Sequence, residues 1–205
     1  MKTLRKALFL DRDGVLNRMV YDETHGIMDS PRRPEQLQIM PGARELLATG
    51  RRLGLLCVIV TNQPGIAKGT LTFAELDALH DELAKQLGDG TSVPWDGCYV
   101  CPNHPEGGAT DERRQYAIAC ECRKPKPGML LRASAELGID LQKSWMVGDG
   151  IVDVQAGRAA GCRTVLVSKL KPELLERLLE TGGGPDFYAA DLGEVVQLLE
   201  QEARP

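Results

Sequence analysis

Short apolar runs alternate with amphipathic stretches along the 205 residues of the chain. Most of these runs are unbroken and rich in β-branched residues, which is typical of strands covered on both faces of a sheet. Between the runs, apolar residues recur at helical spacing. The predicted strands are 6–10, 55–60, 95–100, 144–148 and 163–167, and the predicted helices are 41–54, 72–90, 128–138, 151–161, 172–180 and 192–202. This alternation predicts a central parallel sheet between two helix layers, a Rossmann-like α/β three-layer sandwich.

Local signals mark the ends of several predicted helices. Pro41 occupies a favourable first helical position, and Gly54 is a stop signal for the same helix. Thr72 and Glu75 have the spacing of a capping box, in which each side chain bonds the other residue's backbone N–H. Asp191 is placed to cap the last helix. These signals support the helix assignments independently of the apolar pattern.

Composition and charge narrow the class of protein. The apolar fraction of 42% and the charged fraction of 26% are ordinary for a globular protein. The formal net charge of −4 argues against nucleic acid and anionic membranes as partners, because such partners select a basic surface. No apolar run approaches the roughly 20 residues of a membrane span, and the run 7–10 is too short for a secretory signal. We therefore expect one domain over residues 1–205 and a monomeric, cytoplasmic protein.

Polar residues follow three of the predicted strands. Asp11 and Asp13 come after the first strand, and two carboxylates so close repel each other unless a cation or proton lies between them. Thr61 and Asn62 follow the second strand, where a hydroxyl and an amide suit an anionic oxygen ligand. Asp149 follows the fourth strand. Each pattern alone is equally compatible with a turn or a helix cap.

A basic pair, Arg123 and Lys124, completes the set. Alone, the pair is most simply a surface charge cluster. In an open parallel sheet, however, ligands bind at the carboxyl ends of the strands, so we expect these residues to lie together. The set then contains a carboxylate nucleophile, a second carboxyl group for proton transfer, and a lysine that stabilises phosphoryl oxygens. Those groups are what phosphoryl transfer through an aspartyl-phosphate requires.

Four motifs resemble those of the phosphatases of the haloacid dehalogenase (HAD) superfamily: DRDGV (11–15), VTN (60–62), RKP (123–125) and GDGIVD (148–153). The resemblance implies that Asp11 is the nucleophile and that Asp13 is the general acid and base. It implies that Thr61 and Lys124 hold the transferring phosphoryl group. It also implies a catalytic Mg²⁺ bound by Asp11, the backbone carbonyl of Asp13, and Asp149.

Longer matches narrow the resemblance. FLDRDGVLN, VTNQPGIAKG and CRKPKPGML are similar to the D-glycero-D-manno-heptose 1,7-bisphosphate 7-phosphatases, with the histidinol-phosphate phosphatases as close relatives. This implies hydrolysis of the C7 phosphate of a small sugar phosphate, giving heptose 1-phosphate for the nucleotide-activated heptose of lipopolysaccharide or other surface glycans. It implies substrate contacts from Asn62 and Arg123, and no large cap domain. Histidinol phosphate or another small phosphomonoester is the alternative substrate; a polynucleotide 3′-phosphatase and a non-enzymatic zinc module are less favoured.

Four of the six cysteines lie in residues 98–124. Without a secretory signal, clustered cysteines indicate a metal site more often than disulfides. The metal loop of the resembled family carries Cys-x-His followed by Cys-x-Cys around one Zn²⁺. Cys101, Cys120 and Cys122 match this pattern and supply three thiolates for a tetrahedral site.

The fourth zinc ligand departs from the family pattern. Asn103 occupies the expected histidine position, and an amide oxygen is a poor partner for Zn²⁺ beside three thiolates. We predict His104, the next residue, as the fourth ligand, with Cys98 as the rival and a metal-free loop as the simplest alternative. Four protein ligands leave no open position, so the zinc is expected to be structural. It would fix the loop that aims Arg123 and Lys124 at the phosphate.

Overall fold

The computed structural model describes residues 4–23, 26–89, 92–108, 110–168, 176 and 183–204. A six-stranded sheet in the order β5-β4-β1-β6-β7-β8 forms its centre, and every neighbouring pair is parallel. The strands are β1 (Ala7–Leu10), β4 (Leu56–Asn62), β5 (Gly97–Cys101), β6 (Trp145–Gly148), β7 (Arg163–Val167) and β8 (Phe187–Ala189). The order builds outward from β1 in both directions, as in doubly wound folds. The predicted Rossmann-like sheet is confirmed.

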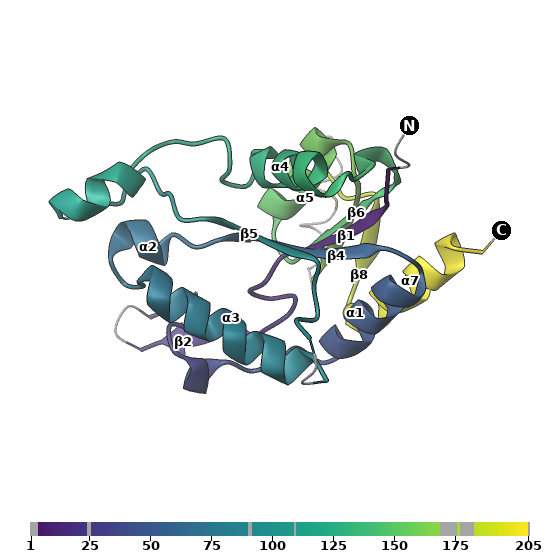
Figure 1. Ribbon diagram of the computed structural model, residues 1–205, viewed down its shortest axis with the longest axis horizontal. Helices are drawn as coiled ribbons and strands as arrows, with labels where there is room; N and C mark the ends of the chain where they lie inside the picture. Colours follow the sequence, from purple (N-terminus) through teal and green to yellow (C-terminus); the bar gives the residue numbers. More distant parts are fainter. Residues whose placement is uncertain are drawn as a thin grey trace.

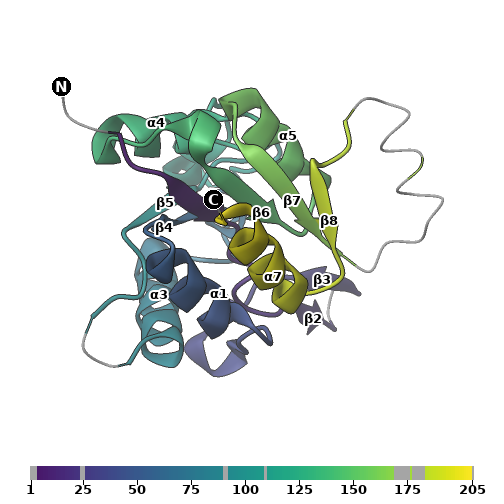
Figure 2. The same ribbon diagram turned by 90° about the vertical axis from the view of Figure 1, so that its right-hand side faces the viewer.

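Helices cover both faces of the sheet (Figure 1 and Figure 2). One face carries α1 (Ala43–Arg52), α3 (Phe73–Leu87) and α7 (Leu192–Glu202). The other face carries α4 (Gly128–Leu137) and α5 (Ile151–Ala160). The layers follow from the side-chain period of two in a strand, which sends neighbours in β1 to opposite faces. Leu8 and Leu10 belong to the first core cluster, whereas Ala7 and Phe9 belong to the second.

Short segments extend from the sheet between its main elements. Residues after β1 form a hairpin, β2 (Val20–Asp22) with β3 (Ile27–Asp29), and the 3₁₀ turn η1 (Pro34–Gln36). The short helix α2 (Gly65–Lys68) follows β4, and the 3₁₀ turn η2 (Asp111–Tyr116) lies in the cysteine loop. Another 3₁₀ turn, η3 (Leu141–Lys143), precedes β6. Within the described ranges, none of these segments forms a cap domain with its own core, as predicted.

Two predicted helix caps are confirmed. The Thr72 hydroxyl accepts the backbone N–H of Glu75 at 3.2 Å, and the Glu75 carboxylate accepts the Thr72 N–H at 2.7 Å. Asp191 accepts the N–H groups of Gly193 and Glu194 at the start of α7. Each side chain satisfies backbone donors that the first turn of a helix leaves without partners.

Other predicted elements differ from the structure. Helix α1 begins at Ala43 rather than at Pro41, because Gly42 has a left-handed φ of 85° and ends the preceding turn. The pattern did not predict β2, β3 and β8, whose three residues each are too few to show a period. The predicted helix 172–180 lies almost entirely outside the described residues. Among the described helices, none is long and apolar enough to cross a bilayer.

Candidate active site and cysteine cluster

Asp11 follows the central strand β1, at the carboxyl edge of the sheet. Its backbone N–H donates to the Val147 carbonyl in β6, so the parallel ladder fixes where the residue emerges. Its carboxylate oxygen Oδ1 lies 2.8 Å from Nζ of Lys124 and accepts the backbone N–H of Arg12 at 2.7 Å. The side chain keeps partial exposure to solvent. Asp11 is therefore held by one cation while remaining accessible to a ligand.

Lys124 joins three segments of the chain at this edge. Its ammonium lies 2.8 Å from Asp11 and 2.6 Å from Asp153, and it donates to the Val60 carbonyl at 2.8 Å. Burial opposes the charged form, but the neighbouring carboxylates outweigh it and raise the pKa of Lys124. Lys124 does not directly follow a strand, because the cysteine loop separates it from the end of β5. Asn62 at the end of β4 holds it through two 3.1 Å hydrogen bonds to its backbone N–H and carbonyl.

Three carboxylates converge beside this lysine. Asp11, Asp149 and Asp153 each place one oxygen within 4.8 Å of the others. Burial and the neighbouring negative charges raise the pKa of Asp11 to about 7 although Lys124 opposes the shift. Burial, followed by the charge of Asp153, raises the pKa of Asp149 to about 6. Crowded carboxylate oxygens that resist ionisation fit a hard divalent cation such as Mg²⁺, which would relieve their repulsion.

Gly14 allows this crowding. Its φ of +89° lies in the left-handed region, and a Cβ atom there would lie only 2.0 Å from an oxygen of Asp149. A residue with a side chain at this position would therefore displace Asp149. The glycine of the DRDGV motif is explained by this close approach between two segments of the site.

Asp13 lies nearby but has a different environment. Its carboxylate accepts hydrogen bonds from the Arg12 guanidinium, the Asn17 amide at 2.8 Å, the Ser30 hydroxyl at 2.9 Å and the Gln63 amide at 2.8 Å. Burial raises its pKa, but the Arg12 charge and these donors outweigh burial and lower the pKa of Asp13 below its ordinary value. Two aspartates two residues apart thus have pKa values shifted in opposite directions, because Asp11 lies among acidic neighbours and Asp13 beside a guanidinium and neutral donors.

Thr61 is the next-to-last residue of β4, which extends two residues beyond the predicted strand, and it is buried near Asp13. Its hydroxyl oxygen accepts a hydrogen bond from the Gln63 amide at 2.9 Å, and the same amide nitrogen donates to Asp13. Because the Thr61 oxygen already accepts from Gln63, its own hydrogen is available for another acceptor. An oxygen of a bound phosphoryl group could take that position.

Arg123 lies between the carboxylate site and the cysteine cluster. It is half-buried, and its guanidinium donates to the carbonyl of Asn103 at 3.3 Å. It directly follows Cys122 in the chain and directly precedes Lys124. The backbone between the two sites is therefore a single short segment, which ties the position of the basic pair to the cysteines.

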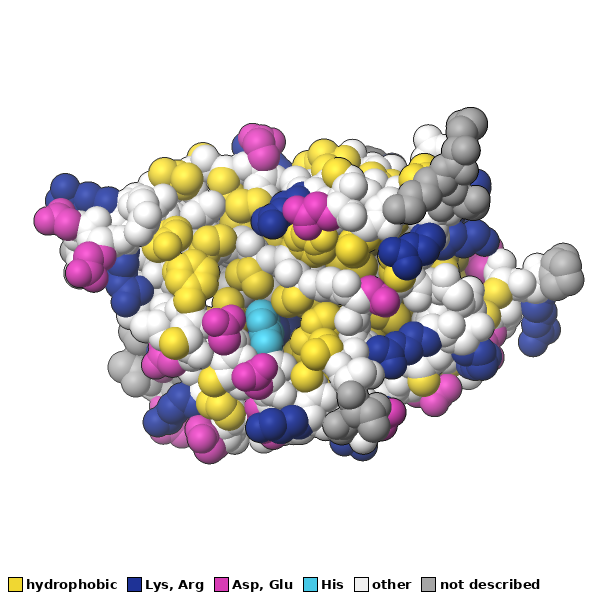
Figure 3. All heavy atoms as spheres, viewed as in Figure 1, with side chains coloured by type: hydrophobic (Ala, Val, Ile, Leu, Met, Phe, Trp, Pro, Cys, Tyr) yellow, Lys and Arg dark blue, Asp and Glu magenta, His cyan; other side chains and the backbone are white. Residues whose placement is uncertain are grey.

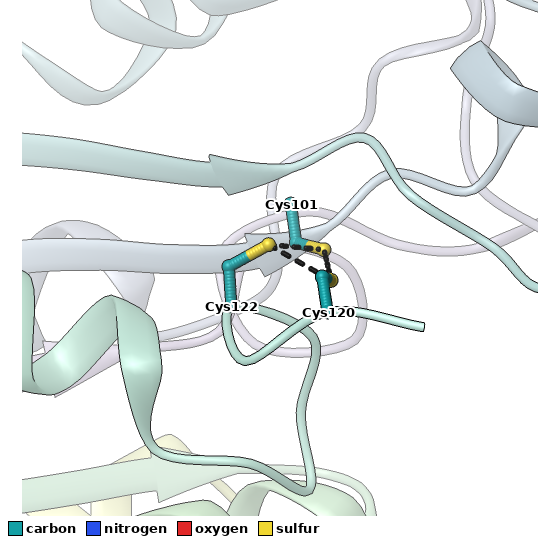
Figure 4. Close-up of side chains that lie close together, drawn as sticks. All are labelled: Cys101, Cys120 and Cys122. Atoms are coloured by element: carbon teal, nitrogen blue, oxygen red, sulfur yellow. Dashed lines mark hydrogen bonds between the residues drawn. The ribbon is translucent and has the colours of Figure 1, made fainter. Parts of the chain in front are cut away.

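Three of the four predicted zinc ligands converge (Figure 4). The sulfur of Cys101 lies 3.5 Å from that of Cys120 and 3.0 Å from that of Cys122, and the last two are 3.0 Å apart. Burial raises the pKa of Cys120, but hydrogen bonds from Cys122, Asn103 and Cys101 outweigh it and lower that pKa to about 7. Three close sulfur atoms, one of them easily ionised, fit the donor set that Zn²⁺ prefers.

The candidates for the fourth zinc ligand differ in where they lie relative to the three cysteines. Cys98 packs with the first core cluster and Cys101 with the second, so the two point to opposite faces of β5. Cys98 therefore does not face the other three cysteines. The ring nitrogen Nδ1 of His104 accepts the backbone N–H of Glu106 at 3.1 Å, and the structure does not bring this ring into the sulfur cluster. The Asn103 amide nitrogen lies 3.5 Å from the Cys122 sulfur.

Sequence reasoning missed several residues that the structure brings into the site. Asp153 was noted in GDGIVD but was not assigned as a ligand, although it joins Asp11 and Asp149. Its place three residues into α5 explains the omission, because an acidic residue there usually only caps a helix; its carboxylate indeed accepts the Gly150 N–H. Ser30 lies in none of the quoted motifs, and Gln63 lies in the VTNQPGIAKG match but has no role assigned from it. Only the folded chain places both at Asp13.

Known proteins resemble this chain over most of its length. The HAD-hydrolase-like family matches residues 121–195. A protein of Pasteurella multocida (strain Pm70) called D-glycero-beta-D-manno-heptose-1,7-bisphosphate 7-phosphatase is 42% identical over 170 residues, which are 82% of this chain and 85% of that protein. The chain belongs to this phosphatase family. The protein of the same name from Escherichia coli (strain K12) is 36% identical over 200 residues, 97% of this chain and 96% of its own.

A solved structure of the family shares the fold. The D,D-heptose 1,7-bisphosphate phosphatase from B. bronchiseptica, complexed with magnesium and phosphate, matches with a TM-score of 0.72 and 31% identity. The match covers 96% of this chain and 99% of that one. The family resemblance predicted from the motifs is therefore confirmed, and the HAD-like fold is shared beyond the motifs themselves.

Proposed function

We propose that this phosphatase hydrolyses the C7 phosphate of D-glycero-D-manno-heptose 1,7-bisphosphate with Mg²⁺ as its catalytic ion. The product, heptose 1-phosphate, would supply nucleotide-activated heptose for lipopolysaccharide or other surface glycans. The single observation that carries the chemistry is the position of Lys124 between Asp11 and Asp153, beside Asp149. Family membership carries the choice of substrate.

The first half of the reaction transfers the phosphoryl group to Asp11. A carboxylate oxygen of Asp11 forms a bond to phosphorus, and the bond between phosphorus and the sugar oxygen breaks with its electron pair going to that oxygen. Asp13 gives a proton to the same oxygen, so the sugar leaves as an alcohol. Lys124 and the Thr61 hydroxyl stabilise the phosphoryl oxygens.

The second half of the reaction releases inorganic phosphate. Asp13, now ionised, takes a proton from a water molecule while the water oxygen bonds to phosphorus. The bond between phosphorus and the Asp11 carboxylate then breaks and restores the nucleophile. This step needs the ionised form of Asp13, which its lowered pKa favours, whereas the first half needs the protonated form, which the negative charge of the bound phosphate ester favours. Asp11, the Asp13 carbonyl and Asp149 would hold Mg²⁺, with Asp153 next to them. The bound ion would supply positive charge that offsets the charge of the phosphoryl group.

The sugar is proposed to occupy a polar groove of about 420 Å³ between the β2–β3 hairpin and the start of α3. Ser30 lines this groove and donates to Asp13, so the groove begins where the leaving group must be protonated. Arg33, which is exposed at the groove, would meet a second phosphate there. Arg123 on the cysteine loop is proposed as a further substrate contact, as the family resemblance implies. A larger cavity of about 490 Å³ borders Gly14 and Asp149, but its three methionines suit a polyhydroxylated anion poorly.

A structural Zn²⁺ is proposed at Cys101, Cys120 and Cys122, with His104 as the fourth ligand once its ring turns toward the sulfur atoms. The donor set of three thiolates and an imidazole is one that structural zinc sites use. Its contribution would be to fix the segment that leads from Cys122 into Arg123 and Lys124. A cytoplasmic location and a monomeric state remain predictions of the sequence.

The test is a phosphate-release panel in the presence of Mg²⁺. It compares kcat/KM for the two C1 anomers of heptose 1,7-bisphosphate, fructose 1,6-bisphosphate, histidinol phosphate and a 3′-phosphorylated oligonucleotide. The relatives are named for the β anomer, so that compound is expected to give the largest value, at least about 100-fold above histidinol phosphate. A larger value for histidinol phosphate would overturn the substrate, and no Mg²⁺-dependent hydrolysis of any compound would overturn the activity.

A further inference from the structure

Arg12 is the largest fully buried side chain among the described residues, and the reaction outlined above gives it no role. It stands between the two catalytic aspartates in the DRDGV motif. Charged side chains are almost never fully buried unless they are paired. The buried charge of its guanidinium therefore needs a partner, and the identity of that partner indicates what Arg12 does.

The guanidinium donates hydrogen bonds to the carboxylate of the adjacent residue, Asp13. Nη2 lies 3.0 Å from both carboxylate oxygens, and Nε lies 3.2 Å from Oδ1. Neighbouring side chains in extended backbone point apart, but here the chain turns at once: the Arg12 carbonyl accepts the N–H groups of Leu16 and Asn17. The tight loop thus brings side chains 12 and 13 onto the same side.

The rest of Arg12 reaches away from the reacting groups. Its Nη1 lies 3.4 Å from Nε2 of His80, on the inner side of α3. Burial, followed by the charge of Arg12, lowers the pKa of His80 to about 4, so the ring is neutral at neutral pH. A neutral ring with its proton on Nδ1 accepts from the guanidinium through Nε2. Asp13 is the only ion-pair partner of Arg12 within the described ranges.

We propose that Arg12 is a positioning residue that fixes the Asp13 carboxyl group for proton transfer to the leaving oxygen, with His80 supporting it from α3. The inference rests on the proposed function, since it assumes that Asp13 is the acid. A planar guanidinium holds a carboxylate at two points and so sets its orientation, whereas a lysine ammonium acts as a point charge. Arg12 would therefore control the angle at which Asp13 meets the substrate.

The dependence on the leaving group separates this role from a merely structural one. An alkoxide needs a proton as the bond to phosphorus breaks, whereas p-nitrophenolate leaves without one. The ratio kcat/KM covers only the steps through the first irreversible one, in which the leaving group departs. A displaced Asp13 should therefore lower kcat/KM for an alkyl phosphate and spare p-nitrophenyl phosphate.

The experiment measures kcat/KM of Arg12→Lys, loaded with Mg²⁺, on heptose 1,7-bisphosphate and on p-nitrophenyl phosphate. We expect a loss of about 100-fold for the sugar phosphate and a change within about threefold for the aryl phosphate. Equal losses for both substrates, or no loss for either, would overturn the proposal. Arg52→Lys is the matched control, because Arg52 pairs with Glu200 on an exposed surface of α1 and touches none of these groups.

A second pair of variants covers the case in which Arg12→Lys does not fold. His80→Leu removes the acceptor and should produce the same selective loss, about 10-fold for the sugar phosphate, while His80→Gln, whose amide oxygen can accept, should recover most of it. Equal activity of these two variants would also overturn the proposal. If the wild type cleaves another alkyl phosphate but not the heptose compound, the proposed substrate fails while the Arg12 test proceeds on that compound.

Discussion

The carboxylate site around Asp11 and the cysteine cluster each bring together side chains that repel or can react with one another. The two sites are stabilised in different ways. At the carboxylate site, parallel strands deliver acidic residues from distant segments, and the buried Lys124 lies between Asp11 and Asp153. In the cysteine cluster, the described partners of the sulfur atoms are other sulfur atoms, an amide and backbone N–H groups. None of these partners carries a positive charge.

This difference indicates which site would depend more on a bound metal for its shape. The sheet holds β1, β4 and β6 together whether or not a cation is bound, and Lys124 already offsets part of the negative charge. The segment that carries Cys120 and Cys122 belongs to no strand or helix of the described chain, so zinc would add a constraint that the sheet does not supply. Substitutions at the carboxylate site should therefore mainly lower kcat, and substitutions in the cysteine cluster should mainly raise KM. On the face shown in Figure 3, acidic and basic side chains are scattered among hydrophobic and neutral ones, and they form no broad patch of one charge.

The largest effect is expected from Asp11→Asn. An amide cannot form the phosphoryl intermediate, so kcat should fall by at least about 10³-fold. Thermal stability should stay the same or rise, because one member of a repelling carboxylate cluster becomes neutral. Phosphate release and thermal unfolding measure the two effects. Asp140→Asn is the control and should retain activity, because the Asp140 side chain pairs with Lys143 before β6. Full activity of Asp11→Asn would remove Asp11 from the role of nucleophile.

Cys122→Ser is expected to act on binding instead. Losing one thiolate should reduce the zinc content and loosen the segment before Arg123 and Lys124, lowering kcat/KM about 10- to 100-fold, mainly through KM. Metal analysis and steady-state kinetics test this. Cys98→Ser is the matched control, because Cys98 lies on the other face of β5 and should retain zinc. An equal loss of zinc in both variants would contradict the separation of Cys98 from the site.

The identity of the fourth zinc ligand has a smaller expected effect. His104→Ala should weaken zinc binding about 10-fold, because the three thiolates would be left with only weak oxygen ligands. Adding Asn103→His to that variant should restore the affinity, since position 103 already lies next to the Cys122 sulfur. A competition titration with a coloured chelator measures both changes. Unchanged affinity in His104→Ala would exclude His104 as a ligand.

The smallest predicted effect is the pH dependence of stabilisation by Mg²⁺. The pKa of Asp11 is about 7 and that of Asp149 about 6, both above the ordinary 3.8. Since unfolding lets these groups ionise more easily, the metal-free protein should lose stability as the pH rises from about 4 to 7. Mg²⁺ binds the ionised groups, so it should raise the melting temperature about 2–4 °C more at pH 8 than at pH 5. An equal shift at both pH values would contradict the prediction.

The sequence predicted much of the fold because most of its strands are long enough to show a continuous apolar pattern. LCVIV (56–60) could be assigned without any tertiary information, and it is indeed the inner strand β4. The three-residue strands β2, β3 and β8 could not, since so few residues show no period and depend on their partners for pairing. Helix α1 was placed two residues early because Pro41 favours a helix start, while the left-handed Gly42 overrides it.

The structure brings the predicted site residues together to differing degrees. Asp11, Thr61 and Asp149 lie together because the carboxyl ends of parallel strands share one edge, which the alternating pattern already implied. Lys124 reaches the same edge from the end of the cysteine loop, which the strand pattern did not imply. Asp153 could not be assigned to the site from the sequence, because only the folded helix α5 brings its carboxylate to 2.6 Å from the Lys124 ammonium. The spacing of the cysteines indicated three zinc ligands but could not choose the fourth.

What the sequence by itself determined is the order of the chemistry-bearing residues along the chain and the family to which they belong. Apolar period and motif spacing are local properties, so they survive without a folded structure. Only the tertiary structure decided the environment of each carboxylate: Asp11 and Asp13 are two residues apart, yet one faces Lys124 and acidic neighbours and the other faces Arg12 and neutral donors. Their pKa values move in opposite directions because burial and neighbouring charge depend on distances that folding alone creates.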